Sequence, residues 1–166
     1  RVPMIQKSIV KLCLKYAKPV VIATQMMQSM IEHNSPLRAE VTDVANAVLD
    51  GADALMLSGE TSVGKFPIKV VETMVKIISE IEKNENIYHK DIKPVINETR
   101  FISDSICLNA YNLATNTEAK VIATLTNSGY STIRTASFRP KSIVLAFTSN
   151  KKLLTVLNLV WGVKCY

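Results

Sequence analysis

The residues that decide the fold are DGADALMLSGETSVGKFP, at positions 50–67, because they combine a helix end, a strand, a polar cluster and a helix start. Gly51 suits the position that ends a helix, since glycine adopts left-handed backbone angles readily. The apolar run 54–57 is typical of a strand buried on both faces, and Pro67 suits the first position of a new helix. The stretch therefore predicts one unit of a parallel α/β fold, with a polar loop at residues 58–61 at the carboxyl end of the strand, where such folds place their chemistry.

A second unit of the same kind lies upstream of this stretch. The apolar run 19–23 opens with a proline, which a strand accepts as its first residue, and it is followed by Thr24 and Gln25. A helix with an apolar stripe at i, i+3, i+4 and i+7 begins at Arg38. Because the carboxyl ends of neighbouring parallel strands share one edge of a sheet, we expect Thr24, Gln25 and residues 58–61 on the same rim. A purely structural role as caps of loops and helices stays open for these side chains.

Composition narrows the class of protein. The chain has 166 residues, of which 48% are hydrophobic and 20% charged, as in ordinary globular proteins. Its net charge of +6 is spread over almost every segment, and only ten residues are aromatic. This pattern argues against a nucleic-acid groove and favours a solvated surface, with phosphorylated small molecules as the next class of partner. No apolar run approaches the roughly 18 residues of a membrane helix, so we expect no membrane partner.

The cysteine and histidine residues do not form a recognisable metal-binding pattern. Cys13, Cys107 and Cys165 lack CxxC spacing and a nearby histidine, and they are interpreted as buried thiols of a cytosolic protein. His33 and His89 are isolated in polar segments. We therefore assign no metal site to these residues.

A polar segment at residues 83–100 has no core-forming period, and we place a domain boundary there. Beyond it, the periodicity of apolar residues predicts a second α/β unit. Its expected elements are a helix at 100–116, a strand at 120–125, a short helix to 138, a strand at 143–147, a helix through Trp161 that ends at Gly162, and a strand from Val163.

The loop between the first strand and the short helix of this second unit is a candidate anion site. Residues 126–132 read TNSGYST, which places several hydroxyl groups and a glycine at a strand-to-helix turn. Backbone N–H groups at such a turn, next to the positive end of a helix, form a good anion cradle. On the residues alone, a simple N-cap is the commoner use of such a turn.

Four stretches of the chain resemble the pyruvate kinase family. They are contiguous, correctly ordered and correctly spaced, and the resemblance covers nearly the whole chain: KPVVIATQM (18–26), RAEVTDVANAVLDG (38–51), MLSGET (56–61) and TxSGxS (126–131). The resemblance implies phosphoryl transfer from phosphoenolpyruvate to ADP, giving pyruvate and ATP, with Mg²⁺ and K⁺ as cofactors. It also implies a cytoplasmic homotetramer with a TIM (β/α)₈ barrel, an inserted lid and a C-terminal α/β effector domain.

The resemblance divides the chain into two regions. Residues 1–86 resemble the C-terminal part of the catalytic barrel, with its last strands and helices, and residues 87–98 form a linker. Residues 99–166 resemble the N-terminal part of the three-layer α/β effector domain. Because the chain starts without an initiator Met and stops within an element, we expect it to be a fragment of such an enzyme.

Two sets of site residues are carried over from the family. Thr24 matches the barrel threonine beside the phosphoenolpyruvate carboxylate, where a hydroxyl can donate to the carboxylate or relay a proton through water. Ser58 matches a serine near the same water network, so both are candidate catalytic residues. Gln25 and Arg38 are assigned to the subunit interface, and Arg38 matches an arginine that reaches the neighbouring active-site loop. Without the resemblance, Arg38 reads as an ordinary surface residue in a first helical turn.

In the family, the loop at 126–131 cradles a phosphate of a sugar-phosphate activator such as fructose 1,6-bisphosphate. The corresponding residues here are Thr126, Asn127, Ser128, Gly129, Tyr130 and Ser131. Many relatives carry a basic residue where this chain has Tyr130, so the identity of the activator is not predicted.

The family's catalytic lysine, and the glutamate and aspartate that hold Mg²⁺, come from barrel strands upstream of Arg1. We therefore assign no metal ligand within the chain, Glu60 and Asp53 included, and expect the segment alone to be inactive. Two other functions stay open: a non-catalytic sugar-phosphate-binding module, in which the loop at 126–131 is the whole function, and another phosphate-binding barrel enzyme, such as an aldolase type.

Overall fold

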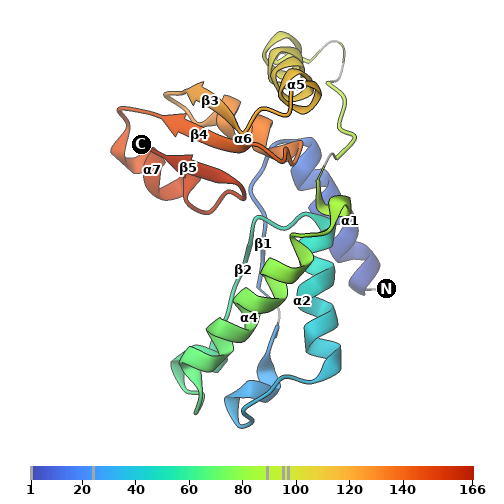
Figure 1. Cartoon of the computed structure of the whole chain (residues 1–166), viewed down its shortest axis with the longest axis vertical. Coiled ribbons are helices and arrows are strands. Elements are labelled where there is room, and N and C mark those ends of the chain that lie inside the picture. Colours follow the sequence, from blue (N-terminus) through green and yellow to red (C-terminus); the bar gives the residue numbers. More distant parts are fainter. Residues whose placement is uncertain (1, 24, 89, 95, 97) are drawn as a thin grey trace. The chain divides into compact units, whose positions relative to one another are not determined.

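A computed structural model describes the chain at residues 2–23, 25–88, 90–94, 96 and 98–166. The chain divides into two compact units, Val20–Ile87 on the one hand and Arg1–Pro19 with Tyr88–Tyr166 on the other. Figure 1 labels most of their helices and strands. All strand pairs within the described residues are parallel, which confirms the predicted α/β class. The domain bounds expected from the sequence stay a prediction. The compact units are groups of residues that pack together, and they do not test which residues belong to which domain.

The unit Val20–Ile87 is built on a pair of short strands, β1 (Val21–Ile22) and β2 (Ala54–Leu55). They pair with Val21 opposite Ala54 and Ile22 opposite Leu55. The remaining elements are η1 (Gln28–Ile31), α2 (Arg38–Asp50), α3 (Gly59–Ser62), α4 (Pro67–Ile81) and η2 (Glu85–Ile87). Helices α2 and α4 pack against each other and lie side by side in Figure 1.

The helix boundaries of this unit follow the sequence signals. Gly51 ends α2 with a left-handed φ of 104°, and Pro67 opens α4 as predicted. Two expectations are wrong in detail. Residues 59–62 form the short helix α3 and not a loop. The two residues of β2 are half-buried and not buried on both faces.

The connection between β1 and α2 is packed into the core of its unit. Three methionines of this segment are almost completely buried, together with side chains from α2 and α4: Met26, Met27, Met30, Val44, Ala47 and Val70. Methionine is unbranched and flexible, so it fills the irregular space beneath a non-helical segment. The long connection is therefore held in one conformation by its own apolar side chains.

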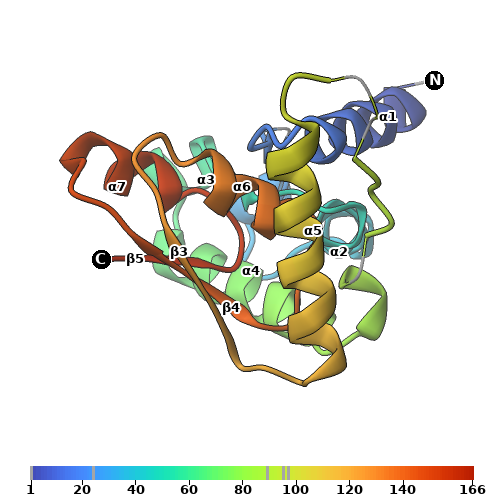
Figure 2. The same ribbon diagram turned by 90° about the horizontal axis from the view of Figure 1, so that it is seen from above.

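The other unit contains a three-stranded parallel sheet in the order β3-β4-β5. Its elements are α1 (Val2–Lys15), α5 (Phe101–Asn116), β3 (Val121–Leu125), α6 (Tyr130–Ser137), β4 (Ile143–Phe147), α7 (Lys151–Leu157) and β5 (Val163–Cys165). Helices α5 and α6 pack against each other, as Figure 2 shows. Leu153 and Leu157 of α7 enclose a core cluster with Ala136 and Ala146.

The prediction for α7 is wrong by one turn at its C-terminus. The helix stops at Leu157 and does not reach Trp161. Leu159 and Val160 donate to carbonyls three residues back, those of Val156 and Leu157, so the chain tightens out of the α-helical pattern there. Gly162, with a φ of 72°, then turns the backbone into β5.

Within the described residues, none of the helices has the length and apolar character needed to cross a membrane.

Candidate functional site

The rim at the carboxyl ends of β1 and β2 carries the first set of predicted site residues. Thr24 lies outside the described residues. Gln25 follows β1 and Ser58 follows β2, and both are exposed. The two strand ends are joined where the N–H of Met56 donates to the carbonyl of Ile22 at 2.9 Å. The structure therefore brings the two predicted loops to one edge of the sheet, as the sequence indicated.

Arg38, predicted at a subunit interface, is the first residue of α2 and is exposed. Its carbonyl accepts a hydrogen bond of 3.0 Å from the hydroxyl of Thr42. The interface role of Arg38 and Gln25 stays a prediction.

Two buried carboxylates hold this rim together, and the sequence reasoning did not find their role. Glu60 is only 3% exposed. It accepts N–H groups from both rim loops, at 3.3 Å from Met27 and at 2.8 Å from Ser58. Burial raises the pKa of Glu60, but the backbone N–H groups of Glu60, Ser58 and Met27 outweigh burial and hold this pKa below its ordinary value. Glu60 therefore serves as an acceptor for backbone N–H groups, and no sequence pattern predicts this role.

Glu40 has a similar role in the first turn of α2. Its carboxylate accepts the N–H and the hydroxyl of Ser29, at 2.7 and 2.5 Å, and the N–H of Leu37 at 2.8 Å. Burial raises the pKa of Glu40, but these hydrogen bonds outweigh it and lower the pKa below the ordinary value. A glutamate at the third position of a helix is half of a capping box, so this contact had a signal in the sequence.

These lowered pKa values make the unit sensitive to acid. Because the folded chain holds the two carboxyl groups at a lower pKa than the unfolded chain does, their stabilisation is complete above the ordinary glutamate pKa of about 4.3 and is lost as the pH falls through the folded values. We expect the urea midpoint to fall between pH 6 and pH 3. The fall should be smaller in Glu40→Gln, while the exposed Glu72→Gln should follow the wild type; parallel curves for all three proteins would contradict this assignment.

The loop at 126–131 carries the second set of predicted residues. The hydroxyl of Thr126 accepts the N–H of Gly129 at 2.8 Å, and the hydroxyl of Ser128 accepts the N–H of Tyr130 at 3.5 Å. Gly129 has a left-handed φ of 83°. Among the residues that the structure describes, the N–H groups of Asn127 and Ser128 donate to no described acceptor. The turn therefore presents N–H groups to solvent at the start of α6, while Thr126 stabilises the turn itself.

Tyr130 is directed toward α5. Its hydroxyl donates to Asp104 at 2.5 Å, and the guanidinium of Arg100 lies 3.9 Å from the centre of its ring. Burial, then the hydrogen bond to Asp104 and the charge of that residue, raise the pKa of Tyr130. Tyr130 is thus held by a carboxylate on a neighbouring helix.

Asp104 also forms a buried ion pair with Arg134, at 3.0 Å. Arg134 donates in addition to the carbonyl of Lys15 at 2.8 Å. Its Nε is buried and has no hydrogen-bond partner among the described residues. This cluster joins α5, α6 and the end of α1, and it was missed because its members are far apart in the sequence.

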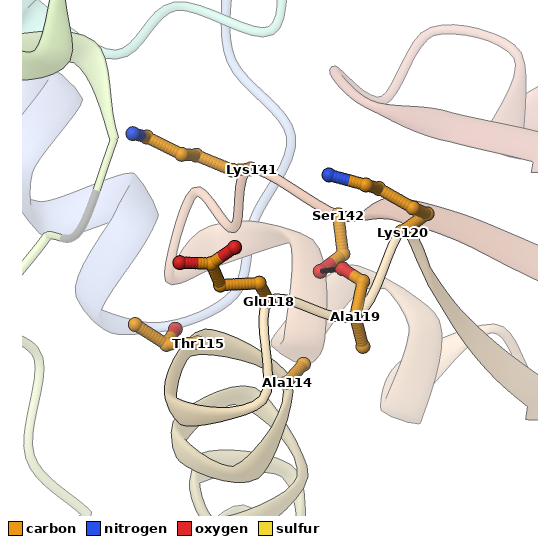
Figure 3. Close-up of a pocket in the computed structure, with 7 residues that line it drawn as sticks. All are labelled: Ala114, Thr115, Glu118, Ala119, Lys120, Lys141 and Ser142. Carbon is orange, nitrogen blue, oxygen red and sulfur yellow. Dashed lines mark hydrogen bonds between the residues drawn. The ribbon is translucent and has the colours of Figure 1, made fainter.

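A cavity of about 370 Å³ lies elsewhere in the same unit. Its lining residues precede β3 and β4, so it opens at the opposite end of the strands from residues 126–131. Figure 3 shows the charged side chains that line it, Glu118, Lys120 and Lys141. None of the residues that the sequence predicted for a site lines this cavity.

No group of three or more His, Cys, Asp and Glu side chains in the described residues is placed to hold a metal ion. His89, one of the two isolated histidines, lies outside the described residues.

Comparison with known proteins places this geometry in a family. The family model described as "Pyruvate kinase, barrel domain" matches residues 1–71, and the one described as "Pyruvate kinase, alpha/beta domain" matches residues 104–166. These matches confirm the predicted fold, a portion of a (β/α)₈ barrel followed by a portion of a C-terminal α/β domain.

Whole-protein comparisons agree. The pyruvate kinase of Clostridium acetobutylicum is 47% identical over 165 residues, which cover 98% of this chain and 34% of that protein. The pyruvate kinase of Thermotoga maritima is 40% identical over 159 residues, or 96% of this chain and 33% of that protein.

Solved structures give the same result. A pyruvate kinase from Cryptosporidium parvum superposes with a TM-score of 0.86 at 37% identity, covering 97% of this chain and 33% of that one. The enzyme of the same organism in complex with ADP gives a TM-score of 0.79, with the same identity and coverage. The chain thus spans about a third of the length of the relatives that it matches. On the two family models and these relatives together, the chain belongs to the pyruvate kinase family.

Proposed function

We propose that the complete polypeptide containing this chain transfers a phosphoryl group from phosphoenolpyruvate to ADP, giving pyruvate and ATP in glycolysis. The observation that carries the proposal is the match of both family models to a chain whose two rim loops follow neighbouring parallel strands. A solved relative in complex with ADP supports the nucleotide as a substrate. The proposed activity implies a cytoplasmic location.

Within this function, Thr24 and Ser58 are the proposed catalytic residues. The hydroxyl of Thr24 would donate to the carboxylate of phosphoenolpyruvate or relay a proton through water to the carbon that becomes the methyl group of pyruvate. Ser58 would order the same water. Arg38 and Gln25 would contact a neighbouring subunit of a homotetramer.

Mg²⁺ and K⁺ are the cofactors that the family implies, and they supply charge neutralisation at the moving phosphoryl group. Among the described residues, no group of three or more His, Cys, Asp and Glu side chains is placed to hold Mg²⁺. We therefore derive no step of the reaction through a metal in this chain.

The loop at 126–131 is the proposed site for a phosphate group of a sugar-phosphate activator. Two N–H groups without a described acceptor, on Asn127 and Ser128, support this assignment, as does the helix α6 that begins at Tyr130. Tyr130 itself is engaged by Asp104. The phosphate would therefore be held by backbone groups and hydroxyls, without the basic side chain that many relatives carry.

Formation of pyruvate tests the proposed activity. We expect the complete polypeptide to convert phosphoenolpyruvate and ADP into pyruvate, and the 166-residue chain alone to show no measurable turnover. Thr24→Ala should lower kcat about 10²-fold, within the general range for a proton-transfer group, and Thr24→Ser should recover most of it. If Thr24→Ala keeps the wild-type kcat, Thr24 has no catalytic role. Turnover of an aldol substrate in place of phosphoenolpyruvate would overturn the proposed function.

A further inference from the structure

Glu60 occupies a position between the two loops that carry the proposed catalytic residues. One carboxylate oxygen accepts the N–H of Met27, in the loop after β1, and the other accepts the N–H of Ser58, in the loop after β2. Met27 lies three residues beyond Thr24, and Ser58 is itself a proposed catalytic residue. A single side chain thus connects the backbones of both loops.

We propose that Glu60 is a positioning residue, which sets the separation and orientation of the two rim loops for phosphoryl transfer. The proposal rests on the proposed function and deepens it. Both oxygens of an ionised carboxylate are acceptors, so one group can fix two N–H donors from different loops. Hydrogen bonds to a charged acceptor are roughly twice as strong as neutral ones, and burial keeps water from competing for the donors.

Further contacts restrain the two loops that Glu60 connects. Met27 is completely buried, so the loop after β1 cannot move away without exposing its side chain. The N–H of Lys65 donates to the carbonyl of Ile31 at 2.9 Å. At Gly64, an added Cβ would lie 2.4 Å from the carbonyl oxygen of Glu60 and 3.3 Å from the Cα of Ile31. The segment 58–65 is therefore docked on the loop after β1 at several points, and the hydrogen bond from Met27 to Glu60 is one of them.

The chemistry of glutamine makes a sharp test. In Glu60→Gln the side chain keeps its shape, but one of the two oxygens becomes an NH₂ group, which faces an N–H donor and cannot accept it. One of the two loops must then lose its contact. Glu72 on α4 is exposed, so Glu72→Gln removes the same charge without touching the rim and serves as the matched control.

The experiment combines kinetics with amide hydrogen exchange on the complete polypeptide. For Glu60→Gln we expect kcat to fall about 10- to 100-fold, the scale of a misplaced reacting group, with KM for ADP within about twofold of the Glu72→Gln control. We also expect the N–H of Met27 or Ser58 to exchange about 10-fold faster, as the loss of one charged hydrogen bond implies. Rates are normalised to the folded fraction, so a role in stability alone leaves kcat unchanged.

Each other outcome overturns a specific claim. If wild-type protein turns over phosphoenolpyruvate and Glu60→Gln matches Glu72→Gln in kcat, Glu60 is not a positioning residue, whether or not exchange changes. If exchange at both N–H groups is unchanged while kcat falls, the hydrogen bonds from Met27 and Ser58 to Glu60 are not the cause of the lower kcat, and the inference fails. Absence of turnover in the wild type overturns the proposed function, and the role of Glu60 falls with it.

Discussion

Asp104→Ala is expected to lower the free energy of unfolding by about 3–5 kcal/mol, the range for breaking a buried ion pair by removing one partner. Asp104 and Arg134 are 5% and 2% exposed. An arginine side chain keeps its positive charge inside a protein. Without Asp104, the buried guanidinium of Arg134 keeps one described hydrogen-bond acceptor, the carbonyl of Lys15. The hydroxyl of Tyr130 loses its acceptor in the same variant. The shift in the urea midpoint, followed by circular dichroism, measures the effect.

An exposed ion pair in the same chain is the control. Glu80 of α4 pairs at 2.6 Å with Lys83, which lies just beyond the end of the helix, and both side chains are more than two-thirds exposed. We expect Glu80→Ala to change the free energy of unfolding by less than about 0.5 kcal/mol, because solvent screens such pairs. The double variant Asp104→Leu with Arg134→Met should recover most of the loss, since it leaves no unpaired charge in the core. Equal midpoints for Asp104→Ala and Glu80→Ala would show that the buried pair does not stabilise the fold.

The order of elements could be predicted from the sequence because each depends on local signals. Gly51 and Pro67 mark a helix end and a helix start by their own backbone preferences. Residues 143–147 form β4 with the predicted bounds, since an apolar run of that length fits a buried parallel strand. Where a boundary depends on hydrogen bonding around a non-helical turn, as after Leu157, the local signal was insufficient and the prediction ran one turn too far.

The sequence did not predict which groups of the site the side chains contact. Placement of the loops on one rim followed from the direction of parallel strands, a property of the backbone. By contrast, Glu60 meets Met27 across 33 positions, and Asp104 meets Tyr130 across 26. Such pairings depend on how the elements pack, and no spacing rule within one helix or strand encodes them. Glu40 is the exception, because its contact with Leu37 falls within one turn of a helix start.

Gly129→Ala tests the loop at 126–131, and we expect it to affect both stability and anion binding. Gly129 has a φ of 83°, and a Cβ there would lie 2.7 Å from a methyl carbon of Leu153. Left-handed strain of about 1–2 kcal/mol and overpacking of about 1–3 kcal/mol predict a loss of roughly 2–5 kcal/mol in the free energy of unfolding. Because the N–H of Gly129 is held by Thr126 in the turn, a shifted backbone also displaces the neighbouring N–H groups from the proposed phosphate.

Gly162→Ala separates backbone strain from the contact with Leu153. Gly162 has a similar φ of 72°, but a Cβ there meets nothing within 4 Å. We expect it to lose only about 1–2 kcal/mol, the strain alone, and to bind fructose 1,6-bisphosphate as the wild type does in calorimetric titration of the complete polypeptide. Gly129→Ala should weaken that binding at least 10-fold, which corresponds to about 1.4 kcal/mol. Equal affinities for the two variants would mean that the phosphate does not bind at this turn, because the two substitutions differ in the loop that they disturb and share the same backbone strain.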